Sequence, residues 1–242
     1  MIKSIFNWSG GKDSSLALHY ILQEKKYDVC ALLTSVSQQY QRVSMHGVRE
    51  ELLQSQITNI GLPYHRLSIP EMPTMEMYDD MMRSTCEHFK SQGIEYSIFG
   101  DIFLEDLKKY REDQLAKVQM QAVFPLWKKD TRQLLEEFID LGFKAVIVCV
   151  NEKYLDQSFA GRKIDKSFVK DLPADVDPCG ENGEYHSFVY DGPIMQRPVD
   201  FEIGEVVYRN YLKEKQAEDN DYYQCTAYDT GFWYCDLIGK QE

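Results

Sequence analysis

The sequence has few of the features that mark secreted, membrane-spanning or zinc-binding proteins. Its six cysteines form no C-x-x-C pair, the spacing that zinc and thioredoxin-like sites use, so we expect reduced cysteines in the core. The longest nearly apolar run, residues 143–150, is far shorter than the roughly 20 residues of a membrane span. No signal-peptide pattern is present, because the apolar residues 5–8 give way at once to a polar stretch. We expect a cytoplasmic protein without membrane contact.

The sequence also has fewer positively than negatively charged residues. The 242 residues include 27 Lys and Arg against 39 Asp and Glu, a net charge of −12. This balance argues against a protein that coats nucleic acid or binds an anionic membrane surface, although it does not exclude tRNA as a partner. The hydrophobic fraction of 43% is ordinary for a protein with a buried core.

Short apolar runs alternate with helical periodicity through the first two-thirds of the chain. Strands are expected at residues 2–8, 29–35, 64–69, 96–99, 122–126 and 145–150. Helices are expected at residues 14–26, 48–60, 74–92 and 131–141, with another running from just after Asp101 to about residue 121. This alternation predicts an α/β fold with a Rossmann-like parallel sheet and helices on both faces. Ligands of such sheets bind at the carboxyl ends of the strands.

The pattern changes after about residue 127. We expect residues 1–127 to form one domain and residues 128–242 a smaller, mixed α/β domain with a β-rich tail. The tail's expected strands are 185–190, 199–208, 222–227 and 232–238, with an exposed loop at 214–221. We interpret the aromatic run at 231–235 as packing.

The first unusual loop lies between a strand and a helix and reads Ser9-Gly10-Gly11-Lys12-Asp13-Ser14-Ser15. Two glycines let the backbone approach a ligand, and the helix amino terminus attracts an anion such as phosphate. Lys12 adds positive charge, and Ser14 could cap the helix or donate to phosphate. The loop is not a Walker A motif, because Asp13 follows Lys12, and no G-x-G-x-x-G occurs.

The second unusual stretch reads Asp177-Pro178-Cys179-Gly180-Glu181-Asn182-Gly183-Glu184-Tyr185-His186-Ser187. Its carboxylates and histidine could bind a cation, orient an amine or supply a general base. Its Asn-Gly pair is equally typical of a hairpin turn, and spacing alone does not decide between the two.

The first loop resembles the S-G-G-x-D-S signature of PP-loop ATP pyrophosphatases. The second stretch resembles E-[NG]-G-E-[YF]-H-[TS] of the diphthine–ammonia ligase family, and residues 124–127, 141–148 and 191–193 also fit that family. The likeness runs from residue 1 to about residue 195. It implies an ATP-dependent amide ligase: ATP activates a carboxylate as an acyl-adenylate, ammonia attacks, and AMP and pyrophosphate leave. In that family the carboxylate belongs to a modified histidine of elongation factor 2.

The resemblance also implies site residues. Residues 1–127 would be the ATP-binding domain and residues 128–242 the substrate domain. Mg²⁺ would lie near Asp13. The expected catalytic residues are Lys12, Asp13, Glu184 and His186. The expected ATP contacts are Ser9, Gly10, Gly11, Lys12, Asp13, Ser14, Ser15, His46, Gly100 and Asp101. The expected substrate contacts are Glu181, Asn182, Gly183, Glu184, Tyr185 and His186. Glu181 and Glu184 would hold a quaternary ammonium by charge, with Tyr185 adding a cation–π contact.

Several residues carry alternatives. Asp101, where the family commonly shows G-A-I, could bind Mg²⁺ or ribose or could cap the next helix. His46 and Arg49 follow the second strand and are candidates for contacting the base. Lys108, Lys109 and Arg111 could form a solvated helix face. Three other functions stay open, namely a related enzyme for another carboxylate, a tRNA-thiolating enzyme, which the charge disfavours, and a non-catalytic ATP or AMP sensor. A homodimer is one assembly left open.

Overall fold

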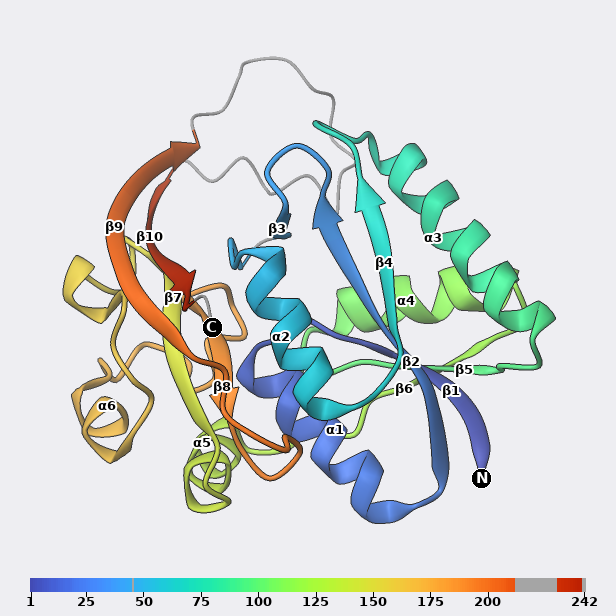
Figure 1. Ribbon diagram of the computed structural model, residues 1–242, viewed down its shortest axis with the longest axis horizontal. Coiled ribbons are helices and arrows are strands. Elements are labelled where there is room, and N and C mark those ends of the chain that lie inside the picture. Colours follow the sequence, from blue (N-terminus) through green and yellow to red (C-terminus); the bar gives the residue numbers. More distant parts are fainter. Residues whose placement is uncertain (45, 212–229, 241–242) are drawn as a thin grey trace.

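Two sheets organise the chain in the computed structural model, which describes residues 1–44, 46–211 and 230–240 (Figure 1). The first sheet consists of β1 (Ile2–Asn7), β2 (Tyr27–Ser37), β3 (Arg42–Val43), β4 (Tyr64–Ile69), β5 (Tyr96–Ile98) and β6 (Gln121–Val123). Five of these strands are parallel, in the order β4-β2-β1-β5-β6, and β3 pairs antiparallel with the end of β2. The chain therefore reverses its direction of strand addition between β1 and β5, and ligands bind at such a point.

Helices cover both faces of this sheet. They are α1 (Lys12–Glu24), α2 (Glu50–Ile60), α3 (Met75–Ser91) and α4 (Glu105–Lys117), whereas α5 (Thr131–Asp140) contacts α6. Leu18 and Ile21 of α1 pack in the same buried cluster as Leu53 of α2, whereas Phe89 of α3 and Leu115 of α4 belong to a separate cluster on the other face. The predicted α/β fold with helices on both faces is confirmed. Among the described residues, no helix is both long enough and apolar enough to span a membrane.

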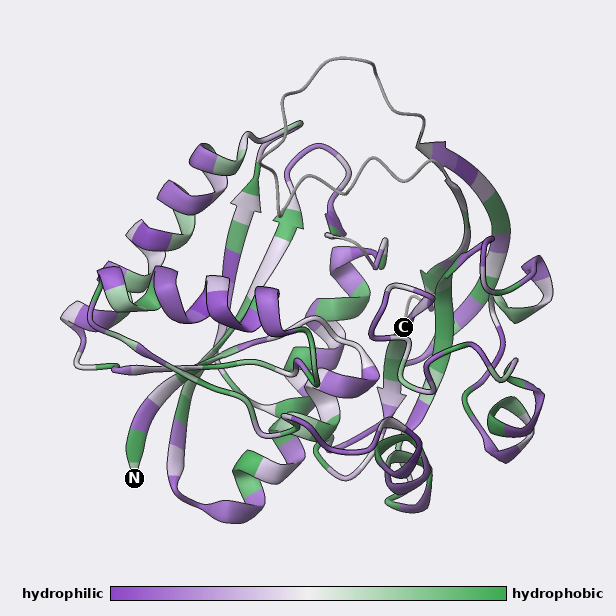
Figure 2. Cartoon of the chain, turned by 180° about the vertical axis from the view of Figure 1, so that it is seen from behind, coloured by the Kyte–Doolittle hydropathy of each residue, from purple (hydrophilic) through white to green (hydrophobic). Residues whose placement is uncertain are grey.

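The second sheet is antiparallel and smaller. Its strands are β7 (Lys144–Asn151), β8 (Tyr185–Asp191), β9 (Phe201–Tyr211) and β10 (Thr230–Gly239), in the order β8-β7-β10-β9. The central strand β7 is buried from Ala145 to Asn151, and Figure 2 shows it as hydrophobic while α4 is largely hydrophilic. The short helices η1 (Gln157–Phe159) and α6 (Lys166–Asp171) lie between β7 and β8 in the sequence. The aromatic run 231–235 lies in β10 and pairs with β7 and β9, which confirms its interpretation as packing.

Some sequence predictions differ from the structure. Helix α4 ends at Lys117 rather than near residue 121, because Gln119 takes a positive φ of 58° and β6 begins two residues later. Strand β3 and helix α6 were not predicted, because each is too short to show periodicity. The expected strand 222–227 and loop 214–221 lie outside the described residues.

The cysteines follow the prediction within the described part of the chain. All of those described are free, and all but one are buried; Cys30 is partly exposed, whereas Cys86, Cys149, Cys179 and Cys235 lie in the interior. Cys225 lies outside the described residues. The domain boundary at 127/128 stays a prediction, since one buried cluster includes side chains from both sheets, such as Phe6 and Phe188.

Gln56 joins the two sheets at a fully buried position. Its Oε1 accepts a hydrogen bond from Trp8 Nε1 at 2.8 Å, and its Nε2 donates to Gly10 O at 3.0 Å and to Val189 O at 2.5 Å. One amide on α2 therefore fixes the end of β1 against β8. Buried polar groups of this kind are costly to leave without partners.

We predict that Gln56→Leu destabilises the protein by about 2–4 kcal/mol, because the Trp8 indole and two carbonyls lose their buried partner. Urea unfolding followed by fluorescence measures the change. Gln54→Leu, at an exposed position of the same helix, is the matched control and should shift stability by no more than about 0.5 kcal/mol. Equal effects of the two substitutions would contradict the assignment.

Candidate functional site

A cavity of about 800 Å³ lies at the carboxyl edge of the parallel sheet. It is lined by residues 9 and 11–14 of the first loop (residues 9–15), by residues 100 and 101 after β5, by α3 and α4, and by residues 179–183 and 185–187 of the second loop (residues 177–187). Its size lies within the range of small-molecule sites. Residues 9–14 follow β1 and residues 100–101 follow β5, and these two segments, which hold most of the expected ATP contacts, meet at this edge.

The first loop presents the amino terminus of α1 to this cavity. Gly10 has a φ of 79°, a turn that favours glycine, and Gly11 is the N-cap of α1 but supplies no side-chain cap. The Ser14 hydroxyl donates to Gly11 O at 2.9 Å instead of capping a backbone N–H, so the capping alternative for Ser14 is wrong. Helix amino termini without a side-chain cap offer N–H groups and a positive dipole end to an anion.

Lys12 is the charged centre of the site, and it is only 4% exposed. Its ammonium donates to Asp13 Oδ2 at 2.8 Å and to the carbonyl oxygen of Cys179, and it lies 4.9 Å from the centre of the Tyr185 ring. Burial alone lowers the pKa of Lys12, but Asp13, Tyr185 and Cys179 together raise it by more, so the group stays charged.

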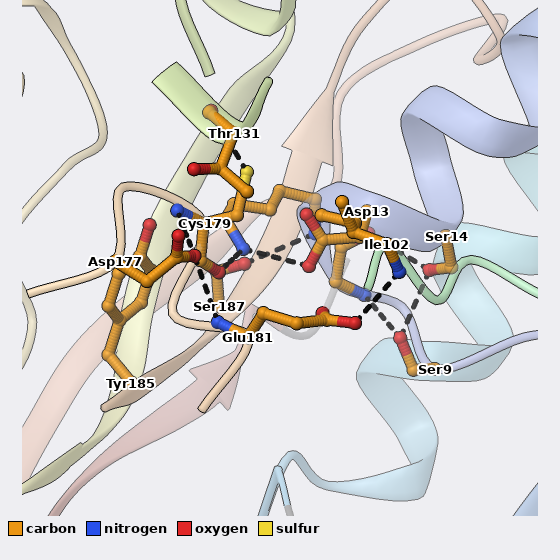
Figure 3. Close-up of polar contacts among 12 residues, drawn as sticks. Ser9, Asp13, Ser14, Ile102, Thr131, Asp177, Cys179, Glu181, Tyr185 and Ser187 are labelled. Carbon is orange, nitrogen blue, oxygen red and sulfur yellow. Dashed lines mark hydrogen bonds and ion pairs between the residues drawn. The ribbon is translucent and has the colours of Figure 1, made fainter. Parts of the chain in front are cut away.

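The two signature loops are therefore parts of one site (Figure 3). Lys12 N donates to Ser187 Oγ at 3.1 Å, and the Glu181 carboxylate accepts from Ile102 N at 2.8 Å. The second loop thus contacts both the first loop and the segment after β5. Residues 175 positions apart in sequence meet here because β8 lies beside α1.

Glu184 has a different position from the one expected. It is 1% exposed and does not line the cavity; its carboxylate accepts from Asp177 N at 3.0 Å, from Asn182 N at 2.9 Å and from Asn182 Nδ2 at 3.0 Å. These bonds close the second loop on itself. The expected direct contact between Glu184 and substrate is not what this geometry favours, because both oxygens already serve the loop.

Tyr185 is likewise engaged by the protein. Its hydroxyl donates to Pro178 O at 2.5 Å, and the cation beside its ring is Lys12. Burial, ahead of other causes, raises the pKa of the Tyr185 hydroxyl well above its ordinary value, so it remains protonated.

His46 and His186 lie together in the cavity wall. Their ring centres are 4.7 Å apart, and His46 Nδ1 is 3.2 Å from Ser187 O. Burial lowers the pKa of His46 to about 4, and burial together with His46 lowers the pKa of His186 well below its ordinary value. Both rings are therefore neutral near pH 7. Arg49, the other candidate for the base, instead forms an ion pair with Asp236.

Asp101 lines the cavity and directly follows Gly100, which lies beside α1. Its Oδ1 accepts from Arg111 at 3.0 Å, while its Oδ2 is buried without a hydrogen-bond partner in the described part of the chain. The capping alternative for Asp101 is wrong, because the N-cap of α4 is Leu104 and no side chain caps it. Gly100 packs against α1, since a Cβ there would lie 3.0 Å from Ser14 N.

The basic residues of α4 divide between two environments. Lys109 is exposed, as a solvated face predicts. Arg111 instead lies over the Phe99 ring at 4.3 Å, and Lys108 lies 5.4 Å from both Phe124 and Trp127. The sequence of the charge run could not predict which of these residues pack on aromatic rings, because the aromatic partners come from other segments of the chain.

Sequence reasoning missed several residues that shape the cavity. Asn7 lies at the end of β1 and donates to Ser97 Oγ at 2.8 Å and to Ile98 O at 2.9 Å. Asp177 accepts from the backbone N–H groups of Cys179 and Glu181 and so fixes the turn of the second loop. The position of Asn7 directly before the first loop could have identified it as a cavity residue. For Asp177, no local pattern in the sequence shows that its carboxylate binds the backbone of the second loop, or distinguishes it from Glu184 in that respect.

Glu181 lines the cavity, and its pKa is shifted toward neutral pH. Burial, followed by the negative charge of Asp13, raises its pKa to about 8 from an ordinary value of 4.5. At pH 7 much of the population is therefore protonated. A carboxyl group with this pKa can accept and release protons near neutral pH.

We predict that Glu181→Gln changes how stability depends on pH. A raised pKa contributes stability that is present below pH 4.5 and is lost as pH rises through 8, so the wild type should lose on the order of 2–4 kcal/mol relative to the variant across that window. Urea unfolding of the ligand-free protein at several pH values measures this. Glu136→Gln, on the exposed side of α5, should run parallel to the wild type, and parallel curves for Glu181→Gln would refute the assignment.

Comparison with known families gives two matches. A model described as diphthamide synthase N-terminal domain matches residues 2–122, and one described as diphthamide synthase C-terminal domain matches residues 130–220. Curated relatives include diphthine–ammonia ligases of Danio rerio (30% identical over 130 residues, 50% of each chain) and of Homo sapiens (29% over 110 residues, 43% of this chain and 41% of the relative). The chain thus spans about half the length of the curated relatives it matches.

Among solved structures, a U34-tRNA thiolase from Methanococcus maripaludis is similar at a TM-score of 0.36 and 19% identity, covering 58% of this chain and 57% of the thiolase.

Proposed function

Because the chain belongs to the diphthamide synthase family, we propose that it is an ATP-dependent amide ligase of the diphthine–ammonia type. The resemblance seen in the sequence is confirmed at the level of the family. In the proposed reaction a substrate carboxylate attacks the α-phosphate of ATP, pyrophosphate leaves, and ammonia displaces AMP from the acyl-adenylate. The observation that carries the proposal is the meeting of both signature loops at Lys12 in one cavity.

The first loop suits the pyrophosphate end of ATP. The N-cap residue of α1 supplies no side-chain cap, so the first turn offers backbone N–H groups beyond that of Lys12, which donates to Ser187 Oγ, and the Lys12 ammonium brings a positive charge to the same wall. Negative charge grows on the leaving pyrophosphate as the α–β bond breaks, and fixed dipoles and charges stabilise it in a cavity from which much water is excluded. Lys12 remains held by Asp13 and Cys179, so it needs little reorganisation when the nucleotide binds.

The residues present fit an Mg²⁺ ion. Asp13 lines the cavity with a carboxylate that is 30% exposed, and the buried Oδ2 of Asp101 has no hydrogen-bond partner among the described residues. No cluster of three or more metal-ligating side chains occurs in the described ranges. One or two carboxylates are what Mg²⁺ takes from a protein when phosphates and water complete its shell. Bound there, the ion would neutralise phosphate charge.

The second loop is assigned to the acyl substrate and ammonia. Glu181 faces the cavity and has the pKa needed to take a proton from ammonium or from the attacking amine. Asn182, Gly183 and His186 line the same wall, with His186 neutral. Glu184 is reassigned as a positioning residue that holds this loop in shape. The proposed substrate, following the names of the relatives, is the modified histidine of elongation factor 2.

A second candidate is the same chemistry on a different carboxylate. Asp101 favours it, because this buried carboxylate stands where family members commonly carry alanine, and it changes the charge of the cavity. The cytoplasmic location stays a prediction, and the homodimer stays open.

Product analysis tests the proposal. Purified protein, ATP, Mg²⁺ and ammonium should release AMP and pyrophosphate in equal amounts when elongation factor 2 carrying diphthine is added. Formation of ADP, or tight ATP binding without turnover in the presence of this substrate, would contradict the ligase. Amide formation on a small carboxylate but not on the protein would select the second candidate.

We predict that Asp13→Ala abolishes pyrophosphate release and lowers stability without unfolding the protein, because Asp13 lines the cavity at the first turn of α1 and the buried Lys12 keeps its contacts with the Cys179 carbonyl and the Tyr185 ring. Pyrophosphate assays and thermal unfolding are the measurements. Asp28→Ala, exposed near the opposite end of β2, is the control and should retain full release. Normal turnover by a folded Asp13→Ala protein would remove Asp13 from the mechanism.

Lys12→Ala should weaken ATP binding about 10- to 100-fold and AMP binding much less, because the lost charge faces the outer phosphates. Calorimetric titration with each nucleotide measures the two affinities. Lys3→Ala, at the other end of β1, should leave both unchanged. Equal losses for ATP and AMP would place Lys12 elsewhere relative to the nucleotide.

A further inference from the structure

One carboxylate of the second sheet binds two arginines outside that sheet, one in β3 and one at the N-cap of α2. Asp236 of β10 accepts from Arg42 Nη1 at 2.9 Å and from Arg49 Nε at 3.1 Å through Oδ1, and from Arg49 Nη2 at 2.6 Å through Oδ2. The contact with Arg49 is bidentate, the geometry in which a guanidinium and a carboxylate fix each other's orientation. We call these three residues the Asp236 clasp.

The two arginines flank the connection between β3 and α2, of which the structure describes residue 44 and residues 46–48. Arg42 is the first residue of β3, and Arg49 is the N-cap of α2. Arg42 Nη1 also donates to Gly47 O at 2.6 Å, within the connection itself. The connection lies so close to β10 that a Cβ at Gly47, where φ is 70°, would sit 3.1 Å from the Tyr234 ring. The clasp and this close approach hold the connection against the second sheet.

The connection carries His46 into the cavity wall. The His46 ring lies 4.7 Å from the His186 ring, tilted by 32°, and it lies against the first loop, since a Cβ on Gly11 would be 2.9 Å from His46 Cε1. Val43 and Ser44 line the same cavity. A shift of the connection would therefore move a wall that borders the proposed phosphate loop.

The clasp is poorly placed to contribute much to global stability. Its side chains are partly exposed, at 34% for Arg42, 37% for Arg49 and 21% for Asp236. Ion pairs with this exposure add little to the free energy of unfolding, because water screens them. What the clasp does determine is local: the direction in which the connection leaves β3 and enters α2.

We propose that Asp236 is a positioning residue of the nucleotide site, which holds Arg42 and Arg49 so that the β3–α2 connection keeps His46 against the first loop. This inference rests on the proposed function for its nucleotide, and it gives β10, beyond the reach of the family signatures, a role in that site. The alternative is that the clasp only joins the two sheets. The two accounts differ in what a substitution of Asp236 changes. The proposal predicts faster amide exchange at residues 46–50 and weaker ATP binding, whereas the alternative predicts faster exchange spread over both sheets.

Asp236→Asn tests the proposal, because it keeps the side chain's shape and removes its charge. We expect backbone amides of residues 46–50 to exchange with deuterium faster, and the Kd for ATP to rise about fivefold or more, with the melting temperature close to that of the wild type. Asp236→Glu should recover most of the affinity. Glu202→Gln is the matched control, since it removes the exposed ion pair between Glu202 of β9 and Lys240, which follows β10, without touching the first sheet.

Unchanged ATP affinity in folded Asp236→Asn protein would overturn the proposal, and so would faster exchange spread evenly over both sheets. If Asp236→Asn fails to fold, Arg49→Lys replaces it, since it retains the charge and loses the bidentate contact. Failure of the proposed function is recognised separately: wild-type protein would not bind ATP, whereas faster exchange confined to residues 46–50 in the variant would still support the clasp.

Discussion

The site depends on a buried ammonium that needs partners from two distant parts of the chain. Lys12 leaves water when α1 packs against β8, and an isolated charge in that position would be strongly unfavourable. Asp13, the Cys179 carbonyl and the Tyr185 ring supply the compensation together. The first loop therefore keeps its charge in place only when the second loop is folded over it, and the two signatures act as one unit.

A second constraint keeps these loops in register. The end of β1 and β8 both bind the amide of Gln56, and Val189 N donates to Gly10 O at 2.9 Å. The antiparallel sheet thus docks onto the parallel sheet through backbone groups that would otherwise be buried without partners. The hydrogen bonds of Asp236 with Arg42 and Arg49 likewise join the β3–α2 connection to the second sheet.

The acidic groups of the cavity follow from the same packing. Asp13, Asp101 and Glu181 come from three segments, and burial, followed by the negative charges of Asp13 and Asp101, raises the pKa of Glu181. A bound cation or an incoming ammonium relieves this repulsion. The neutral state of His46 and His186 has the same origin, since Lys12 and burial both disfavour a second positive charge.

The sequence by itself determined the parallel sheet, the helices on both faces and the two loops that line the cavity, because periodicity and glycine-rich strand ends are local properties. It also determined the family. Only the tertiary structure decided that Glu184 accepts hydrogen bonds from its own loop, that Arg49 pairs with Asp236 and that Arg111 lies over the Phe99 ring. Those outcomes depend on which partners lie within about 3–4 Å once distant segments pack, and spacing along a chain carries no information about that.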